Sequence, residues 1–349
     1  MWPMTDTLTW KTILNRLVAQ EDLSSPEITW AMNDIMAGST PEAIIGAFLV
    51  GLHVKGETPE ELAALAQGML DKAEQIEVTR DAVDIVGTGG DQQNTVNIST
   101  MASLVAAGAG VPVIKHGNRA SSSSSGSADV LAELGINLNL NIKDVAGAVE
   151  AAGITFLFAQ VFHPSMRHVA PTRRSIGVPT AFNYLGPMTN PARVRASAIG
   201  VADAEMAEKI AAVFASRGDH ALIFRGNDGL DEITITGESK VWETFDGGVR
   251  QHSITPTDFG LDLATLDDLR GGDAQHNAQV VHQVLAGTPG PILNAVLLNA
   301  AAGITAFRPV DGRPFQERFQ QALGDARLSV ETGQAKAVLE RWIAYSNSK

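Results

Sequence analysis

The spacing of apolar residues divides the chain into a helical first part and a mixed remainder. Up to about residue 78, apolar positions recur every three or four residues, as in 27–36 and 60–70, which is the period of an amphipathic helix. Three of these segments begin with a hydroxyl residue, a proline and a glutamate, at 25–27, 40–42 and 58–60. Each of these residue types suits the first turn of a helix, so the pattern predicts a small helical domain.

From residue 82 onward, short runs rich in β-branched residues alternate with helical segments. The expected strands are 83–86, 111–115, 136–140, 154–158, 194–202 and 221–226. Because alternation of strand and helix is the signature of βαβ units, we expect a mainly parallel sheet. The runs 232–237, 240–245 and 250–256 are expected to add antiparallel strands, and helices dominate from about residue 266.

The segment 163–190 interrupts this alternation. It joins a helix with several basic side chains to a stretch rich in Pro, Gly and Asn. A long irregular segment inside a compact domain is usually functional or crosses between domains. The expected fold class is therefore α/β, with a small helical lobe of 1–78 plus about 163–193. The larger α/β lobe would hold 79–162 plus about 194–349, with a mainly parallel central sheet and antiparallel additions.

The amino-acid composition argues against some classes of binding partner and some kinds of site. The chain has 349 residues, of which 44% are apolar, so it can bury a substantial core. Its net charge is −13 and no block of Lys and Arg stands out, which argues against a nucleic-acid partner. A phosphate-bearing ligand would have to be held locally by N–H groups, a few cations or metal ions. The chain has no cysteine, which excludes disulfides, Cys-ligated zinc and thiol nucleophiles.

Targeting signals are not expected. The first ten residues lack a basic region followed by an apolar core, so they do not resemble a signal peptide. The apolar run 43–54 is too short to span a bilayer. We therefore expect a cytoplasmic protein without a membrane partner.

A glycine-rich turn, Gly87-Thr88-Gly89-Gly90-Asp91, follows the first expected strand and precedes a helix. Such a turn presents backbone N–H groups and suits an anion. It is not the dinucleotide fingerprint, because Gln92 takes the place of the third glycine, and no Gly-Lys-Ser/Thr follows as in a Walker loop. A purely structural turn is equally compatible with these residues. Hydroxyl and amide side chains that could converge on a phosphate follow at Thr95, Asn97, Ser99 and Thr100.

A second candidate anion-binding loop runs from Lys115 to Asp129 and contains five consecutive serines. Lys115 ends a strand that should lie beside 83–86, and ligands of such sheets bind at the carboxyl ends of strands. Serine runs are usually flexible linkers. This run is short, however, and lies between an expected strand and a helix.

Two further groups of side chains could carry chemistry. Asp231 and Glu232 are adjacent at the edge of an expected strand, and Mg²⁺ commonly binds one or two carboxylates together with substrate phosphates. Asp228 in the same loop is more simply a solvated turn residue. In the irregular segment, Arg173 with Arg174 could clamp a carboxylate, although arginine pairs on helices are most often surface residues.

These stretches, in this order, resemble anthranilate phosphoribosyltransferase. The resemblance runs from the helical lobe nearly to the C-terminus, and it is the ordered set of motifs that makes it specific. The motifs are Gly87-Thr88-Gly89-Gly90-Asp91, Asn97-Ile98-Ser99-Thr100, Lys115-His116-Gly117-Asn118-Arg119, Gly126-Ser127-Ala128-Asp129, His163-Pro164, Phe182-Asn183, Leu185-Gly186-Pro187 and Asp231-Glu232.

The resemblance implies a reaction and a ligand set. The amino group of anthranilate would attack C1 of 5-phosphoribosyl-1-pyrophosphate (PRPP), with Mg²⁺ as cofactor and pyrophosphate as leaving group, in tryptophan biosynthesis. It also implies PRPP bound by the α/β lobe, anthranilate entering between the lobes, and a homodimer.

Residue roles follow from the same resemblance. The implied anthranilate contacts are Gly87, Asn118, Arg173 and His163, and the implied metal positions are Ser99, Asp231 and Glu232. The implied PRPP contacts are Gly87, Gly90, Asp91, Thr95, Asn97, Ile98, Ser99, Thr100, Lys115, His116, Gly117, Asn118, Arg119, Ala120, Ser121, Ser122, Ser123 and Ser127. No general base is assigned, and Lys115, His116, Asn118 and Arg173 are expected to position the reactants.

Two other classes remain as alternatives. A pyrimidine nucleoside phosphorylase shares the helical-plus-α/β architecture, but its glycine loop typically starts with Lys-His-Ser, where this chain has Asp84-Ile85-Val86. A non-catalytic relative that binds nucleic acid would need a basic groove, which the net charge argues against.

Overall fold

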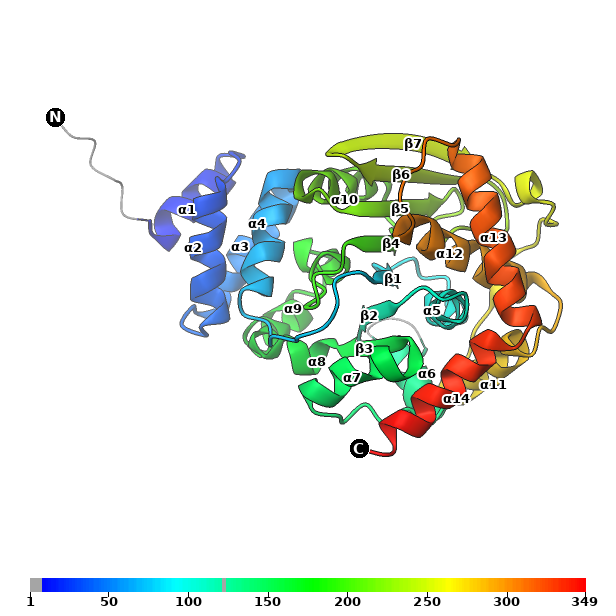
Figure 1. Cartoon of the computed structure of the whole chain (residues 1–349). Helices are drawn as coiled ribbons and strands as arrows, with labels where there is room; N and C mark the ends of the chain where they lie inside the picture. The colour runs from blue at the N-terminus through cyan, green and yellow to red at the C-terminus, as the bar shows by residue number, and fades with distance from the viewer. Residues whose placement is uncertain (1–7, 121–123) are drawn as a thin grey trace. The chain divides into compact units, whose positions relative to one another are not determined.

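The computed structural model describes residues 8–120 and 124–349 (Figure 1). The chain forms two compact units. One comprises the described part of Met1–Glu74 together with Gln160–Thr189, and the other comprises Gln75–Ala159 and Asn190–Lys349. Among the described residues, no helix combines the length and the apolar character that crossing a bilayer would require.

The first unit is helical throughout its regular elements. They are α1 (Trp10–Val18), α2 (Ser25–Met36), α3 (Glu42–Lys55), α4 (Pro59–Leu70), the end of α8 (Ala159–Phe162), η1 (Pro164–His168), α9 (Ala170–Ile176), η2 (Ala181–Asn183) and η3 (Gly186–Met188). Apolar faces of the first four helices form its core, in which Trp10 packs edge-on against Trp30 and Phe48. Burial of such amphipathic faces stabilises a helix more than its intrinsic propensity does.

The three expected helix starts differ in detail. Thr58 caps α4 as predicted, because its hydroxyl accepts a hydrogen bond from the Glu61 N–H at 3.1 Å. The cap of α2 is Ser24, one residue earlier than predicted. The Thr40 hydroxyl does not cap α3 but donates to Asp34 at 2.6 Å, and α3 begins after Pro41.

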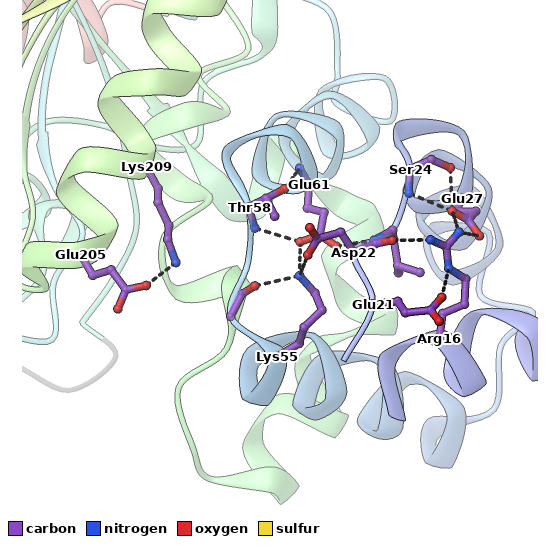
Figure 2. Close-up of polar contacts among 12 residues, drawn as sticks. Arg16, Glu21, Asp22, Ser24, Glu27, Lys55, Thr58, Glu61, Glu205 and Lys209 are labelled. Carbon is purple, nitrogen blue, oxygen red and sulfur yellow. Dashed lines mark hydrogen bonds and ion pairs between the residues drawn. The ribbon is translucent and has the colours of Figure 1, made fainter. Parts of the chain in front are cut away.

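Ion pairs join these helices at their ends, as Figure 2 shows. The Lys55 ammonium lies 2.7 Å from Asp22 and 2.8 Å from Glu61. The fully buried Glu61 also accepts the Leu23 N–H at 2.7 Å and the Thr58 N–H at 2.9 Å. Every oxygen of this carboxylate is therefore paired, which offsets the cost of burying it.

The second unit is built on a seven-stranded sheet of order β3-β2-β1-β4-β5-β6-β7. The first five strands of that order are parallel, and β6 and β7 are antiparallel additions, which confirms the predicted fold class. The strands are β1 (Val83–Gly87), β2 (Val113–Gly117), β3 (Ile154–Phe158), β4 (Ala196–Gly200), β5 (His220–Gly226), β6 (Ser239–Phe245) and β7 (Gly248–Ile254).

Helices cover this sheet. They are α5 (Ile98–Gly108), α6 (Ser127–Glu133), α7 (Ile142–Ala152), α10 (Ala204–Arg217), α11 (Ala274–Leu285), α12 (Pro291–Phe307), α13 (Phe315–Glu331) and α14 (Gln334–Ser346), with short turns η4 (Pro256–Phe259) and η5 (Leu266–Leu269). The almost wholly buried α12 packs against α5, α13 and strands β1, β4 and β5 (Figure 1). At Gly303 its backbone comes so close to Ile85 that a Cβ would overlap that side chain.

Two expected strands are absent from the described structure. Residues 136–140 form no ladder, because the Asn137 N–H donates to the Ser346 hydroxyl and the Asn139 N–H to the Asn137 side chain. Residues 232–237 are also irregular, and the backbone of Ile233 bonds to the side chain of Asn299 in place of a neighbouring strand. Side-chain partners thus replace the ladder in both segments.

Candidate active site

Most of the residues with an expected role lie where parallel strands of the second unit end. The glycine turn follows β1, the serine-rich loop follows β2, and the acidic pair follows β5. In parallel sheets the crevice beyond the carboxyl ends of the strands is the usual place for a ligand.

The glycine turn is tied directly to the acidic pair. The Gly89 N–H donates to Asp231 Oδ2 at 2.7 Å, and the Thr88 N–H donates to the Gly200 carbonyl at 2.9 Å. Gly89 and Gly90 have φ of 71° and 86°, and nothing lies within 4 Å of where a Cβ would be. Glycine is therefore needed here for its left-handed backbone rather than for space.

Asp231 and Glu232 lie in a close-fitting cradle, which is formed by the backbone of Gly87, Gly200 and Ser99. A Cβ at Gly200 would overlap the Asp231 carbonyl oxygen, and one at Gly87 would overlap the Asp231 carboxylate. The Ser99 N–H, at the start of α5, donates to Glu232 Oε1 at 3.2 Å. These contacts bring together four separate segments, and they place Ser99 beside Glu232, two of the three residues for which the resemblance implies a metal role.

The acidic side chains in and beside this cradle outnumber the one buried lysine near them. Burial and the nearby Asp91 raise the pKa of Asp231 to about 7. Burial and the charge of Asp231 raise the pKa of Glu232 well above its usual value. Burial lowers the pKa of Lys115, against the opposing pull of Asp84, Glu232 and Asp231. Crowded acids beside a single buried lysine would be stabilised by a further cation.

The donor set fits Mg²⁺. The two carboxylates and the Ser99 hydroxyl are oxygen donors, and Mg²⁺ usually takes one or two carboxylates while keeping waters or phosphate oxygens. Within 8–120 and 124–349, no three His, Asp or Glu side chains converge as a ready-made metal cage. A metal held here would therefore be shared with an anionic ligand.

Lys115 lies beside the acidic pair, within a network of buried polar groups. Its ammonium donates to the Ile85 carbonyl and to the Ser99 hydroxyl, the latter at 3.2 Å. Asp84, the second residue of β1, accepts from the Asn190 side chain at 2.8 Å and from the His116 N–H at 3.2 Å. Burial raises the pKa of Asp84 to about 6. Sequence reasoning gave Asp84 no role, although a carboxylate inside an apolar strand before a glycine turn was a usable signal.

The serine-rich loop is closed by Asp129, which also had no predicted role. Its carboxylate accepts from the Ala120 N–H at 2.9 Å, the Gly126 N–H at 3.0 Å and the Arg119 guanidinium at 2.8 Å. Asn118, Arg119 and Ala120 are exposed, as a ligand-binding loop requires. The expected contacts Ser121, Ser122 and Ser123 lie outside the described residues.

The start of α5 connects this loop to a more distant helix. The Asn97 side chain donates to the Ser125 carbonyl at 3.0 Å and accepts from Asn277 at 2.8 Å. Asn277, on α11, also accepts the Gly272 N–H at 2.9 Å. Sequence reasoning did not identify Asn277, because nothing in a single amphipathic helix shows which loop it meets.

Some residues expected to contact PRPP have a structural place in the fold, and two of them have buried side chains. The Ile98 side chain lies in the hydrophobic core and its N–H donates to the Val96 carbonyl at 2.7 Å. Thr100 is also buried. Thr95 forms an isolated antiparallel bridge with Arg270, which fixes the path of the chain between the glycine turn and α5.

The helical unit holds His163 and Arg173. His163 is buried, lies 3.0 Å from the Thr189 carbonyl through Nε2, and has its pKa lowered to about 4 by burial. It is therefore neutral at pH 7. Arg173 is half-buried, donates to Asn183 Oδ1 at 3.3 Å and stacks over Phe182, and burial lowers its pKa.

Comparison with known sequences places this geometry in a family. Residues 79–336 match the family described as "Glycosyl transferase family, a/b domain", and residues 11–73 match its helical bundle domain. Anthranilate phosphoribosyltransferase of Arthrobacter sp. (strain FB24) is 54% identical over 96% of both chains. The chain belongs to the anthranilate phosphoribosyltransferase family. The enzyme of that name from Salinispora arenicola is 51% identical over 97% of both chains.

Solved structures of the family have the same fold. Anthranilate phosphoribosyltransferase from Thermus thermophilus superposes with a TM-score of 0.89 at 40% identity, covering 96% of this chain and 99% of that one. The Saccharomyces cerevisiae enzyme in complex with PRPP and Mg has a TM-score of 0.88 at 29% identity, covering 97% and 98%. The family's α/β domain contains both the glycine turn and the acidic pair of this chain.

Proposed function

We propose that this protein transfers the 5-phosphoribosyl group of PRPP to the amino group of anthranilate. The products are N-(5-phosphoribosyl)anthranilate and pyrophosphate, and the step belongs to tryptophan biosynthesis. The observation that carries the proposal is the buried pair Asp231 and Glu232, held against the glycine turn by the Gly89 N–H. Family membership over nearly the whole chain gives the substrate, and the S. cerevisiae relative binds PRPP and Mg.

The residue roles are part of the same proposal. Ser99, Asp231 and Glu232 would hold Mg²⁺, which when bound neutralises charge on the departing pyrophosphate. Gly87, Asn118, Arg173 and His163 would contact anthranilate, with Arg173 facing its carboxylate. The phosphates and ribose of PRPP would meet the glycine turn, the start of α5 and the loop from Lys115 to Ser127. A cytoplasmic location remains part of the proposal and rests on the biosynthetic family alone.

The reaction requires the protein mainly to position the two substrates and to neutralise the negative charge of the phosphates. The C1–O bond to pyrophosphate breaks, the C1–N bond forms, and the amine then gives up a proton. The aromatic amine is already uncharged at pH 7, so no strong general base is required, and the neutral His163 is consistent with that. Lys115 and those N–H groups of the glycine turn that do not bond within the protein, unlike the Thr88 and Gly89 N–H, would stabilise the anionic phosphates.

A fluorescence assay tests the function. Purified protein is mixed with anthranilate, PRPP and Mg²⁺, and the loss of anthranilate emission is followed. Loss that requires both PRPP and Mg²⁺, and that stops with EDTA, is the expected result. Folded protein that consumes no anthranilate would reject the proposal.

We also propose that the protein is a homodimer that uses its helical unit. Val18 on α1 and Val50 and Val54 on α3 are exposed by 82%, 36% and 68%, although they are apolar. Exposed apolar residues that gather on neighbouring helices are typical of an interaction surface, and symmetric dimers are the commonest soluble oligomers.

The dimer proposal predicts the effect of a charge on this surface. Val54→Glu should convert the dimer to a monomer in sedimentation velocity, because a buried carboxylate without a partner opposes association. Leu328→Glu is the matched control, since Leu328 on α13 is exposed by 55% in the other unit and should leave the dimer intact. A monomeric wild-type protein would refute the proposal.

A further inference from the structure

Asn299 is an unexpected residue for its place in the fold. It lies in the middle of α12, where every residue from Ala295 to Ala306 is buried, and its neighbours in that stretch are almost all apolar. Asparagine is a poor helix former, and burying an amide costs free energy unless its hydrogen bonds are satisfied. A specific partner must therefore compensate for it.

That partner is the backbone directly after the acidic pair. Asn299 Oδ1 accepts the Ile233 N–H at 2.9 Å, and Asn299 Nδ2 donates to the Ile233 carbonyl at 3.0 Å. Nδ2 also donates to the Ala295 carbonyl at 2.9 Å within α12. The side-chain amide thus pairs with Ile233 as a neighbouring strand would, in a segment that has no strand partner.

The hydrogen bonds of Asn299 to Ile233 complete the contacts that hold the acidic pair in its cradle. Gly87 and Gly200 leave no room for Asp231 to move toward them, and the Ser99 N–H holds Glu232. Those contacts act on Asp231 and Glu232 themselves, whereas Asn299 fixes the next peptide units along the chain. With both sides of the pair held, the two carboxylates have a defined spacing.

We propose that Asn299 is a positioning residue that sets the geometry of the Asp231–Glu232 carboxylates for a divalent cation. The inference rests on the proposed function for the identity of the site. Asn299 touches neither metal nor substrate and acts through the Ile233 backbone. Groups of this kind, which hold metal ligands in place, typically contribute tenfold to a hundredfold to metal affinity.

The experiment measures binding rather than turnover. Mn²⁺ is titrated into the full-length protein with pyrophosphate present and into the same pyrophosphate without protein, free Mn²⁺ is followed by electron paramagnetic resonance, and the difference gives the Mn²⁺ bound to protein. Asn299→Leu keeps a similar side-chain volume but removes the hydrogen bonds, and it should weaken Mn²⁺ binding about tenfold or more. Asn299→Ser is the milder variant and is measured as well, at low temperature, so that a folded protein is available for the comparison.

Leu298→Ala is the matched control. Leu298 is the buried neighbour of Asn299 on α12, and its truncation also destabilises the unit, but its aliphatic side chain cannot hydrogen-bond to Ile233. We expect a lowered melting temperature with Mn²⁺ affinity within about twofold of wild type, because the metal ligands keep their backbone support. If Leu298→Ala weakens Mn²⁺ binding as much as Asn299→Leu does, Asn299 contributes only to stability and the proposal is overturned.

Two other outcomes are decisive. A folded Asn299→Leu or Asn299→Ser variant that binds Mn²⁺ like the wild type would overturn the inference. Wild-type protein that binds no Mn²⁺ with pyrophosphate would overturn the metal site and the inference with it. Wild-type protein that binds Mn²⁺ but does not consume anthranilate would reject the proposed function. The Mn²⁺ affinities of the variants would still decide whether Asn299 positions the carboxylates.

Discussion

At the scale of single residues, the candidate site depends on groups whose properties are set by burial. Asp231, Glu232 and Lys115 are all nearly inaccessible to water, and the acids outnumber the lysine. Since burial disfavours the charged form of each, the metal-free site tends to hold protons that a cation would displace.

This predicts a pH-dependent metal affinity. The pKa of Asp231 is raised to about 7, so the stability that comes from its protonation is present at low pH and lost as pH rises through about 7. A divalent cation binds the ionised form, so Mn²⁺ affinity should rise by up to about tenfold per pH unit below pH 7 through Asp231, and Glu232, whose pKa is also raised, adds to the rise. Mn²⁺ titrations at several pH values measure this, and Asp228→Asn, in the same loop, should retain the dependence. An affinity that does not change between pH 6 and 8 would contradict it.

A second residue-scale prediction concerns the glycine turn. Gly89→Val places a β-branched residue at φ of 71° and should remove most PRPP turnover, because the turn can no longer present its N–H groups. Gly218→Val is matched, since Gly218 also has φ of 71°, has open space around it and caps α10. Both variants should lose similar stability by urea unfolding, and equal activities would argue against a ligand-binding turn.

Single residues also show what could be predicted from sequence. The glycine turn and the acidic pair could be singled out from the sequence because they belong to an ordered set of motifs that resembles one family, although neither motif is specific alone. Asp84, Asn277 and Asn299 were not assigned, because each is a polar residue whose hydrogen-bond partner lies far away in sequence. Their identity depends on tertiary contacts that one sequence does not contain.

At the scale of elements, local rules gave the helices and most strands, and failed where side chains replaced backbone partners. The run 232–237 has the composition of a strand, yet Asn299 takes the place of its ladder. In the helical unit the ends of α3 and α4 are joined by the pair Lys55 and Glu61. Burial alone would lower the pKa of Lys55, but its bonds to Asp22 and Glu61 raise it.

This pair yields a prediction on stability. Lys55→Met removes the cation and leaves Glu61 buried without a charged partner, which should lower the free energy of unfolding by about 3 kcal/mol. Adding Glu61→Gln should recover part of the loss, since the uncompensated charge is then removed as well. Urea denaturation of the single and double variants measures the coupling. Losses that simply add would show that the two side chains act independently.

At the scale of the whole molecule, the antiparallel edge of the sheet is fastened by one buried carboxylate. Glu243 on β6 lies 3.4 Å from His220 on β5, 3.2 Å from His252 on β7 and 2.8 Å from Arg318 on α13. Burial alone would raise the pKa of Glu243, but hydrogen bonds from these three residues lower it far below its usual value. One side chain therefore joins three strands and a helix.

The sign of this shift predicts the acid response. A lowered folded-state pKa means that the stabilisation is fully present above the unfolded value of about 4.3 and is lost as pH falls further. Glu243→Gln should cost about 3 kcal/mol at pH 7 and progressively less between about pH 4 and 2. Unfolding by urea at several pH values measures the difference. A constant difference down to pH 2 would rule out a role for the Glu243 charge.

The division of the chain into two units has a consequence for how the protein is made. The chain leaves the helical unit after residue 74, returns to it for 160–189 and leaves again. During synthesis on the ribosome, the helical unit is therefore incomplete until residue 189 has been added to the chain. The strands β1, β2 and β3 are synthesised before β4 to β7 and α12, and the contact between Ile85 and Gly303 cannot form until Gly303 has been synthesised. The helical unit can therefore be completed about halfway through translation, whereas the α/β unit is completed only when its C-terminal helices have been synthesised.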